Sequence, residues 1–261
     1  MSESTIGAAG APQTETTAAS SPDFSDGRPV IYFGGYLNGQ KHVNRVAERL
    51  TVALGAEVLG RTALWAFRHP TEVRELVEGD STGIEDDAAH VIVNSASGAA
   101  LVNANPRTMA SFTSVETTKP TPIPMAMWRL GRLLWSQDKK ANDPQRSVVE
   151  RKAYNASKWG KLKEGLSHPI GYMRYLGKVA GINVLNWEGE IAQKGVPVRD
   201  IRSTYDEMYE PPTQNEIEAA QAKGVDVVVV ANDPKLDHEG IVVNTEVAAK
   251  YITGQEAGSN N

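Results

Sequence analysis

The chain has 261 residues, a formal net charge of −5 at pH 7 and no cysteine. This length allows one large domain or two small ones, and the missing thiol excludes disulfides, a cysteine nucleophile and thiolate metal sites. No apolar run approaches the roughly 18 residues that a transmembrane helix needs. The N-terminus lacks the basic and then apolar pattern of a secretory signal. We therefore expect a soluble, cytoplasmic globular protein.

Low-complexity segments are expected at both ends. Residues 1–27 are mostly Ser, Thr, Ala, Gly, Pro and acidic residues, with isolated Ile6 and Phe24, and residues 255–261 have a similar composition. Such segments cannot bury enough apolar surface to offset the entropy that they lose on ordering. We therefore predict disordered tails at 1–27 and 255–261.

The first half of the folded unit alternates short apolar runs with amphipathic segments. Runs of β-branched and aromatic residues predict strands, and apolar residues at three- and four-residue spacing predict helices. The expected strands are 29–33, 63–67 and 90–93, and the expected helices are 43–54 and 70–77.

The same alternation resumes in the last third of the chain. The pattern predicts a helix over 187–193, a strand opening at 195–198, a helix after the capping box of Thr213 and Glu216, a strand over 225–230 and a helix over 246–252. Strands that alternate with helices favour an α/β fold, with a mostly parallel sheet and helices on both faces.

Between these two parts the composition changes. From Lys119 to Lys178 there are 13 Lys and Arg against 4 Asp and Glu, a local charge of +9, so the remainder of the chain carries −14. The segment also holds several Trp and Tyr residues. We interpret 119–180 as a basic, aromatic helical lid inserted into a core formed by 28–118 and 181–254.

Ligands and catalytic groups of parallel sheets collect at the carboxyl ends of the strands. In chain order, the residues that follow the expected strands supply a glycine-rich turn, a serine on a strand-to-helix turn, an acid and a histidine. These stretches are Gly34 to Tyr36, Asn94 to Gly98, Tyr205 to Met208, and Asn232 to His238.

This order, and several local stretches, resemble the α/β-hydrolase fold family. Residues 30–36 resemble its first core strand and oxyanion loop, and 92–98 resemble the turn that bears its nucleophile. Residues 192–208 are similar to the approach to its acid loop, and 237–252 to its histidine loop and last helix. The resemblance covers nearly all of residues 28–252.

The resemblance implies a serine hydrolase that cleaves carboxylic esters or thioesters through an acyl-enzyme. Ser95 would be the nucleophile, His238 the general base and Asp206 the acid that orients the imidazole. Glu207 and Asp233 are alternatives for the acid.

The same resemblance implies how the substrate is held. The backbone N–H groups of Tyr36 and Ala96 would stabilise negative charge on the substrate carbonyl oxygen. Gly35 and the lid residues Trp128 and Trp135 are the candidate substrate-binding residues.

The nucleophile turn has three open registers, because the family pattern needs small residues two places before and two places after the serine. Ser95 keeps the preceding strand residues in register, whereas Ser97 has small residues at both flanking positions. A third register puts Ala96 at the apex. That register would make the protein a catalytically inactive, hydrolase-like binding or scaffold protein with no usable nucleophile.

No His-x-x-x-His pair, phosphate-binding loop or dinucleotide fingerprint occurs, so we expect neither a metal nor a cofactor. The expected partner is a small-molecule ester or thioester with an apolar acyl part. Contact of the basic lid with nucleic acid or an anionic membrane is the lesser alternative, because the basic residues are dispersed and the whole chain is acidic.

Overall fold

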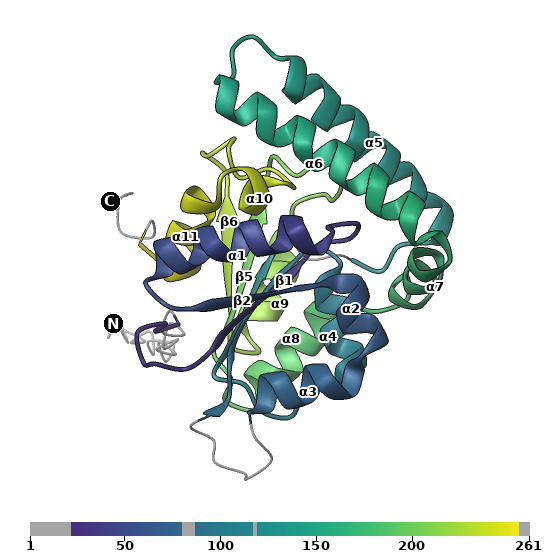
Figure 1. Cartoon of the computed structure of the whole chain (residues 1–261). Coiled ribbons are helices and arrows are strands. Elements are labelled where there is room, and N and C mark those ends of the chain that lie inside the picture. Colours follow the sequence, from purple (N-terminus) through teal and green to yellow (C-terminus); the bar gives the residue numbers. More distant parts are fainter. Residues whose placement is uncertain (1–21, 80–86, 117–118, 256–261) are drawn as a thin grey trace, which may run out of the picture.

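Six parallel strands form a single sheet in the order β2-β1-β3-β4-β5-β6 (Figure 1). The computed structural model describes residues 22–79, 87–116 and 119–255, so most of the two predicted tails lies outside the described residues. The strands are β1 (Val30–Gly34), β2 (Val58–Thr62), β3 (His90–Asn94), β4 (Ser111–Val115), β5 (Val198–Ser203) and β6 (Val225–Val230). The predicted α/β class with a parallel sheet is confirmed.

Helices cover both faces of this sheet (Figure 1). One face carries α1 (Gln40–Leu54), α10 (Gly240–Val243) and α11 (Thr245–Thr253), and the other carries α2 (Ala63–Arg68), α3 (Pro70–Glu78), α4 (Ser97–Ala104), α8 (Val184–Ala192) and α9 (Gln214–Gln221). Successive strand residues point to opposite faces. In β1, Val30 and Tyr32 pack into the first layer, and Ile31 and Phe33 into the second.

The strand order reverses at β1. This strand pairs with β2 on one side and with β3 on the other. The chain therefore leaves the carboxyl end of β1 toward one face of the sheet and the carboxyl end of β3 toward the opposite face. A crevice opens where the connections diverge in this way, and it is where open α/β sheets bind ligands. The topology therefore places the segments after β1 and β3 at the expected binding position.

Two elements differ from the sequence prediction. Residues 63–67, expected as a strand, lie in helix α2, and the second strand is β2 at 58–62. A short apolar run fits a buried helix as well as a strand, and the Thr62 side chain caps this helix by accepting a hydrogen bond from Trp65 N at 3.1 Å. Strand β4 was not predicted, because three of its five residues are Ser or Thr, although all five are buried.

Part of the predicted N-terminal tail belongs to the packed structure. The Phe24 side chain is 5 % exposed and packs in the α1 layer, with its ring centroid 5.1 Å from that of His90. Nearby, Asp26 Oδ1 lies 3.1 Å from His90 Nε2. One aromatic anchor and one polar contact thus order the described residues 22–27, which their composition alone does not suggest.

The segment between β4 and β5 forms three helices that rise over the carboxyl ends of the strands (Figure 1). They are α5 (Ile123–Asn142), α6 (Val148–Ser167) and α7 (Pro169–Val179). Helix α6 starts at a capping box formed by Ser147 and Glu150. In the part of the chain that the structure describes, no helix combines the length and the hydropathy needed to cross a membrane. The helical insertion has the place expected of a lid.

Candidate active site

A sharp turn joins β3 to α4, and Ser95 occupies its apex. Ser95 has φ +55°, a left-handed conformation that costs energy for a residue with a side chain. Its backbone N–H donates to the Val115 carbonyl at 2.9 Å, which ties the turn to β4. A strained strand-to-helix turn of this kind lifts a side-chain hydroxyl out of the backbone and exposes it to the crevice. Of the three open registers, the structure has the one with Ser95 at the apex.

Ser97 has a different position. It is fully buried at the start of α4, and its Oγ accepts a hydrogen bond from Asn94 N at 3.0 Å. The same oxygen lies 2.8 Å from the carbonyls of Phe33 and Asn94, to either of which the hydroxyl donates. Ser97 therefore fastens the turn to β1, and its hydroxyl is already engaged with the backbone.

The loop after β1 passes directly beside this turn. A Cβ on Gly35 would lie 2.7 Å from Asn94 Oδ1 and 3.3 Å from Ser95 Cβ, so no larger residue fits without moving the turn. Glycine is needed here for close approach. Gly35, Tyr36 and Ala96 all line the same pocket as Ser95. The two N–H groups expected to bind an oxyanion thus belong to residues that line this pocket together with the serine.

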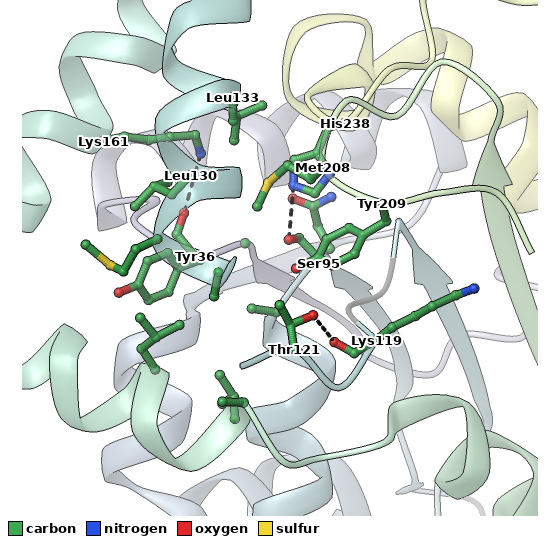
Figure 2. A pocket seen from close by; sticks show the side chains of 18 of the residues that line it. Tyr36, Ser95, Lys119, Thr121, Leu130, Leu133, Lys161, Met208, Tyr209 and His238 are labelled. Carbon is green, nitrogen blue, oxygen red and sulfur yellow. Dashed lines mark hydrogen bonds between the residues drawn. The ribbon is translucent and has the colours of Figure 1, made fainter. Parts of the chain in front are cut away.

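Three side chains from three loops form a continuous hydrogen-bonded chain. Ser95 Oγ lies 3.1 Å from His238 Nε2 (Figure 2). His238 Nδ1 lies 3.0 Å from Asp206 Oδ2. With the imidazole neutral and its proton on Nδ1, Nδ1–H donates to the carboxylate and Nε2 accepts from the serine hydroxyl. All three groups are at most 4 % exposed.

Backbone contacts hold the acid of this chain. Asp206 Oδ1 accepts hydrogen bonds from the N–H groups of Met208 at 2.6 Å and Tyr209 at 3.1 Å. Burial raises the pKa of Asp206, but the His238 imidazole and the hydrogen bonds to the carboxylate outweigh it and lower the pKa overall. For His238, burial lowers the pKa, and the charge of Asp206 more than compensates, so that the imidazole pKa is raised.

The two alternative acids point to other partners. Glu207 accepts a hydrogen bond from Ser136 of the lid at 2.8 Å and pairs with Lys140. Asp233 accepts from the backbone N–H of Lys235 at 3.0 Å, within its own turn. Asp206 is therefore the acid of the three that faces the imidazole.

A fourth acidic residue, which the sequence analysis missed, lies behind Asp206. Glu116 follows β4 directly, has φ +54° and is 2 % exposed. Its Oε1 accepts from Ser203 N at 2.8 Å, and its carboxyl is hydrogen-bonded to that of Asp206. Burial and the negative charge of Asp206 raise the pKa of Glu116 well above its ordinary value. This shift favours the protonated form of Glu116, which can donate a hydrogen bond to Asp206.

The lid binds the acidic residues that flank the histidine. Asp237 accepts from Lys140 Nζ at 2.7 Å and from the Tyr154 hydroxyl. Glu239 pairs with Lys161 Nζ at 3.0 Å and accepts from Ser157 Oγ at 2.8 Å. Helices α5 and α6 thus hold the histidine loop from above through charged and hydroxyl groups.

Lys161 also reaches the loop after β1. Its Nζ donates to Asn38 Oδ1 at 2.6 Å and approaches the Tyr36 carbonyl at 3.5 Å, and the side chain is almost fully buried. One ammonium group therefore connects the lid, the histidine loop and the predicted oxyanion loop (Figure 2).

A pocket of about 670 Å³, including space open to solvent, lies between the turn and the lid. Much of its lining is apolar and includes Ala126, Met127, Leu130, Leu133, Leu176, Val179 and Met208. Figure 2 labels Leu130, Leu133 and Met208 among them. Trp128 and Trp135 are not among the lining residues. Each is 59 % exposed on the outward side of α5, so the structure does not bring these two predicted substrate-binding residues to the pocket.

The residues that the structure describes contain no group of three or more His, Asp or Glu side chains arranged to hold a metal ion.

Comparisons with known proteins bear on the fold. No protein-family model matches the chain, and no curated protein matches it by sequence. Among solved structures, MenH from S. aureus is similar over 90 % of this chain and 95 % of its own, with TM-score 0.53 and 13 % identity. A carboxylesterase of the thaumarchaeon Nitrososphaera gargenis has TM-score 0.56 and 13 % identity, over 88 % of this chain and 90 % of its own.

A third structure agrees with these two. A putative non-heme bromoperoxidase, BpoC from Mycobacterium tuberculosis, has TM-score 0.54 and 15 % identity, over 90 % of this chain and 94 % of its own. At such low identity the likeness shows the fold alone. Together with the sheet order, the strained serine turn and the helical insertion, it shows that the chain has the α/β-hydrolase fold.

Proposed function

We propose that this protein is a serine hydrolase that cleaves small carboxylic esters or thioesters through an acyl-enzyme. The observation that carries the proposal is the hydrogen-bonded chain from Ser95 through His238 to Asp206, with the serine at a strained turn. A serine hydroxyl is a weak nucleophile until a neighbouring imidazole accepts its proton. The esterase among the similar structures supports the reaction class by analogy of fold.

The first half of the reaction forms the acyl-enzyme. Ser95 Oγ attacks the carbonyl carbon while His238 Nε2 takes the hydroxyl proton, and Asp206 stabilises the resulting imidazolium. The imidazolium then protonates the leaving alcohol or thiol as its bond to the carbonyl carbon breaks. In the second half, water attacks the acyl-enzyme with His238 again as base, which releases the acid and restores the serine.

Charge on the carbonyl oxygen requires donors fixed in advance. The backbone N–H groups of Tyr36 and Ala96 are the donors in this proposal, and removal of one such donor typically costs a hundredfold or more in rate. Gly35 supports this role because its missing side chain lets the loop lie against the serine turn.

Glu116 would act as a positioning residue. By donating a hydrogen bond to Asp206 and accepting one from Ser203 N, a neutral Glu116 carboxyl would restrain the acid. An ionised Glu116 would instead repel Asp206, so its proton is part of the proposed arrangement.

The pocket favours substrates with an apolar acyl group of modest size. Leu, Met, Val and Ala side chains line the pocket together with Ser95, and an acyl chain placed against them would leave water. Gly35 also lines the pocket, whereas Trp128 and Trp135 do not.

The proposal is tested by labelling the purified protein with a fluorophosphonate probe and mapping the modified peptide. We expect label on Ser95, its loss in Ser95→Ala and in His238→Ala, and its retention in Ser97→Ala. Hydrolysis of short and medium p-nitrophenyl esters should follow the same order of variants.

The alternative is a hydrolase-like binding protein without a usable nucleophile. If Ser95 does not react while a known serine hydrolase is labelled in parallel, the proposed mechanism is contradicted and this alternative is favoured. Label on Ser97 instead would contradict the role of Ser95 and favour the register in which Ser97 is the nucleophile.

A further inference from the structure

Helix α5 is apolar on two sides, and the pocket accounts for one of them. Ala126, Leu130 and Leu133 line the pocket. A second row of residues faces away from the pocket. Its members alternate three- and four-residue spacing, which puts them on one face of the helix. We name this row the outer stripe; it consists of Met125, Trp128, Arg132, Trp135 and Lys139.

The outer stripe is open to solvent. Met125 is 46 % exposed, and Trp128 and Trp135 are each 59 % exposed. Trp128, Arg132 and Trp135 together line a shallow surface hollow. Large apolar side chains gathered on one face, with no cover from the residues that the structure describes, are typical of a surface that contacts another phase or molecule.

Each tryptophan of the stripe has a cation over its ring. Lys139 Nζ lies 3.5 Å from the ring centroid of Trp135, and Arg132 Cζ lies 5.7 Å from that of Trp128. The stripe therefore presents indoles and positive charges side by side over about four turns of helix.

The rest of the lid has the same character. Most of the exposed large hydrophobic side chains in the described residues belong to the lid, and those outside it are Val52, Leu59, Tyr205 and Val229. Helices α6 and α7 add Trp159, Leu166, Ile170 and Met173, all more than half exposed. Residues 119–178 carry a formal charge of +9 and the remainder of the chain carries −14, so the lid is the part of the chain whose charge favours an anionic partner.

We propose that the outer stripe of α5 docks the lid on the surface of an anionic lipid bilayer. Tryptophan side chains prefer the headgroup level of a bilayer, where the apolar ring and the polar N–H are both accommodated. Lys and Arg beside them pair with anionic headgroups. The helix would lie in the plane of the interface, with its pocket-lining side turned toward the protein.

Two other occupants fit the observations less well. A symmetric contact with a second copy would bring two surfaces of like charge together, which is unfavourable. Single-stranded nucleic acid binds by stacking bases on aromatic rings, but the rings of Trp128 and Trp135 already have cations over them. An anionic bilayer accommodates the indoles at its headgroup level and pairs its headgroups with the cations.

The test is co-sedimentation of the full chain with phosphatidylcholine vesicles, with and without phosphatidylserine. We expect strong partitioning only onto the anionic vesicles, with a blue shift of tryptophan fluorescence. Each neutralised cation should weaken partitioning roughly fivefold, so that Arg132→Gln with Lys139→Gln costs about 25-fold. Trp128→Ala with Trp135→Ala should cost at least about tenfold.

The matched control neutralises two exposed cations at the opposite edge of the sheet. Arg107 and Lys194 precede β4 and β5, so they lie at the amino ends of the strands. Arg107→Gln with Lys194→Gln removes the same charge and should leave partitioning within about twofold of the parent, because headgroup attraction is local. Thermal melting of every variant checks the fold.

Three results would overturn the proposal. The first is equal partitioning onto neutral and anionic vesicles. The second is an equal loss of partitioning in the control and the stripe variants. The third is a dimer in solution that Trp128→Ala with Trp135→Ala disperses, because that result would assign the stripe to a contact with a second copy. Binding to single-stranded RNA in preference to anionic vesicles would likewise replace the proposed partner. Ser95→Ala should bind vesicles like the parent, so the docking surface and the proposed chemistry are tested separately.

Discussion

The sheet and the α5–α6 hairpin hold the candidate site by different kinds of interaction. The sheet places Ser95, Asp206 and His238 in the segments that follow parallel strands. A strained turn and a backbone hydrogen bond hold Ser95, and two backbone N–H groups hold the Asp206 carboxylate. The hairpin contacts the acidic neighbours of the histidine through Lys140 and Lys161. The serine and the acid thus depend on backbone geometry, whereas the helices that cover them depend on charged contacts.

The largest expected effect comes from changing the acid held by the sheet. Asp206→Asn should lower kcat/KM for an ester by roughly 10³- to 10⁴-fold, because the amide favours the wrong imidazole tautomer and does not stabilise the imidazolium. Steady-state hydrolysis measures this effect, and urea unfolding checks that the fold survives. Asp233→Asn is the matched control and should keep parental activity; a variant at 206 that keeps more than about a tenth of it would refute the assignment.

A change in the hairpin should instead be seen in stability. Lys161→Met leaves the buried carboxylate of Glu239 without its cation, which typically costs about 3–5 kcal/mol of unfolding free energy. Lys163→Met, on an exposed position of the same helix, should stay within about 0.5 kcal/mol of the parent. Urea unfolding measures both variants, and equal values for the two would show that the buried pair does not hold the lid.

Substitutions of Glu116 distinguish a hydrogen-bonding role of this residue from a role of its charge. Gln has the same shape and can both accept from Ser203 N and donate to Asp206, so Glu116→Gln should keep kcat/KM within about threefold. Glu116→Leu removes both contacts and should lower kcat/KM roughly tenfold to a hundredfold by releasing the acid. If the two variants lose activity equally, the carboxyl acts through its charge and not as a neutral donor.

The smallest expected effect is in the pH profile. Catalysis needs neutral His238, and Asp206 raises the imidazole pKa above its ordinary value of 6.5. The rate kcat/KM should therefore be low at acid pH, rise as the imidazole loses its proton, and reach its plateau only after a midpoint above 6.5. Glu116→Gln should leave this limb in place, since the role proposed for Glu116 is that of a neutral donor. A midpoint below 6.5 would contradict the strong Asp206 contact.

Much of the sheet could be predicted from sequence because its strands are locally distinct. The runs at 30–34 and 225–230 are β-branched and apolar, and each ends in glycine or polar residues. Residues that follow such strands are natural candidates for a site, which is how Ser95 and His238 were selected.

Features that depend on tertiary contacts could not be predicted from the sequence. Glu116 was missed because β4 has no apolar pattern of its own and is buried by its neighbours. Periodicity puts Trp128 and Trp135 on one face of a helix but does not say which face looks into the pocket. The choice among Ser95, Ala96 and Ser97 depended on the turn conformation, which one residue of register decides.

The strand order also governs when the site comes into being during synthesis. Ser95 and Gly35 follow the central strands β3 and β1, whereas Asp206 and His238 follow β5 and β6, the last two strands of the chain. Because domains begin to fold as the chain emerges, a nascent chain ending before β5 carries the serine without a base to activate it. The activity proposed for the folded protein would therefore be absent from every shorter intermediate, and would first appear when the C-terminal strands join the sheet.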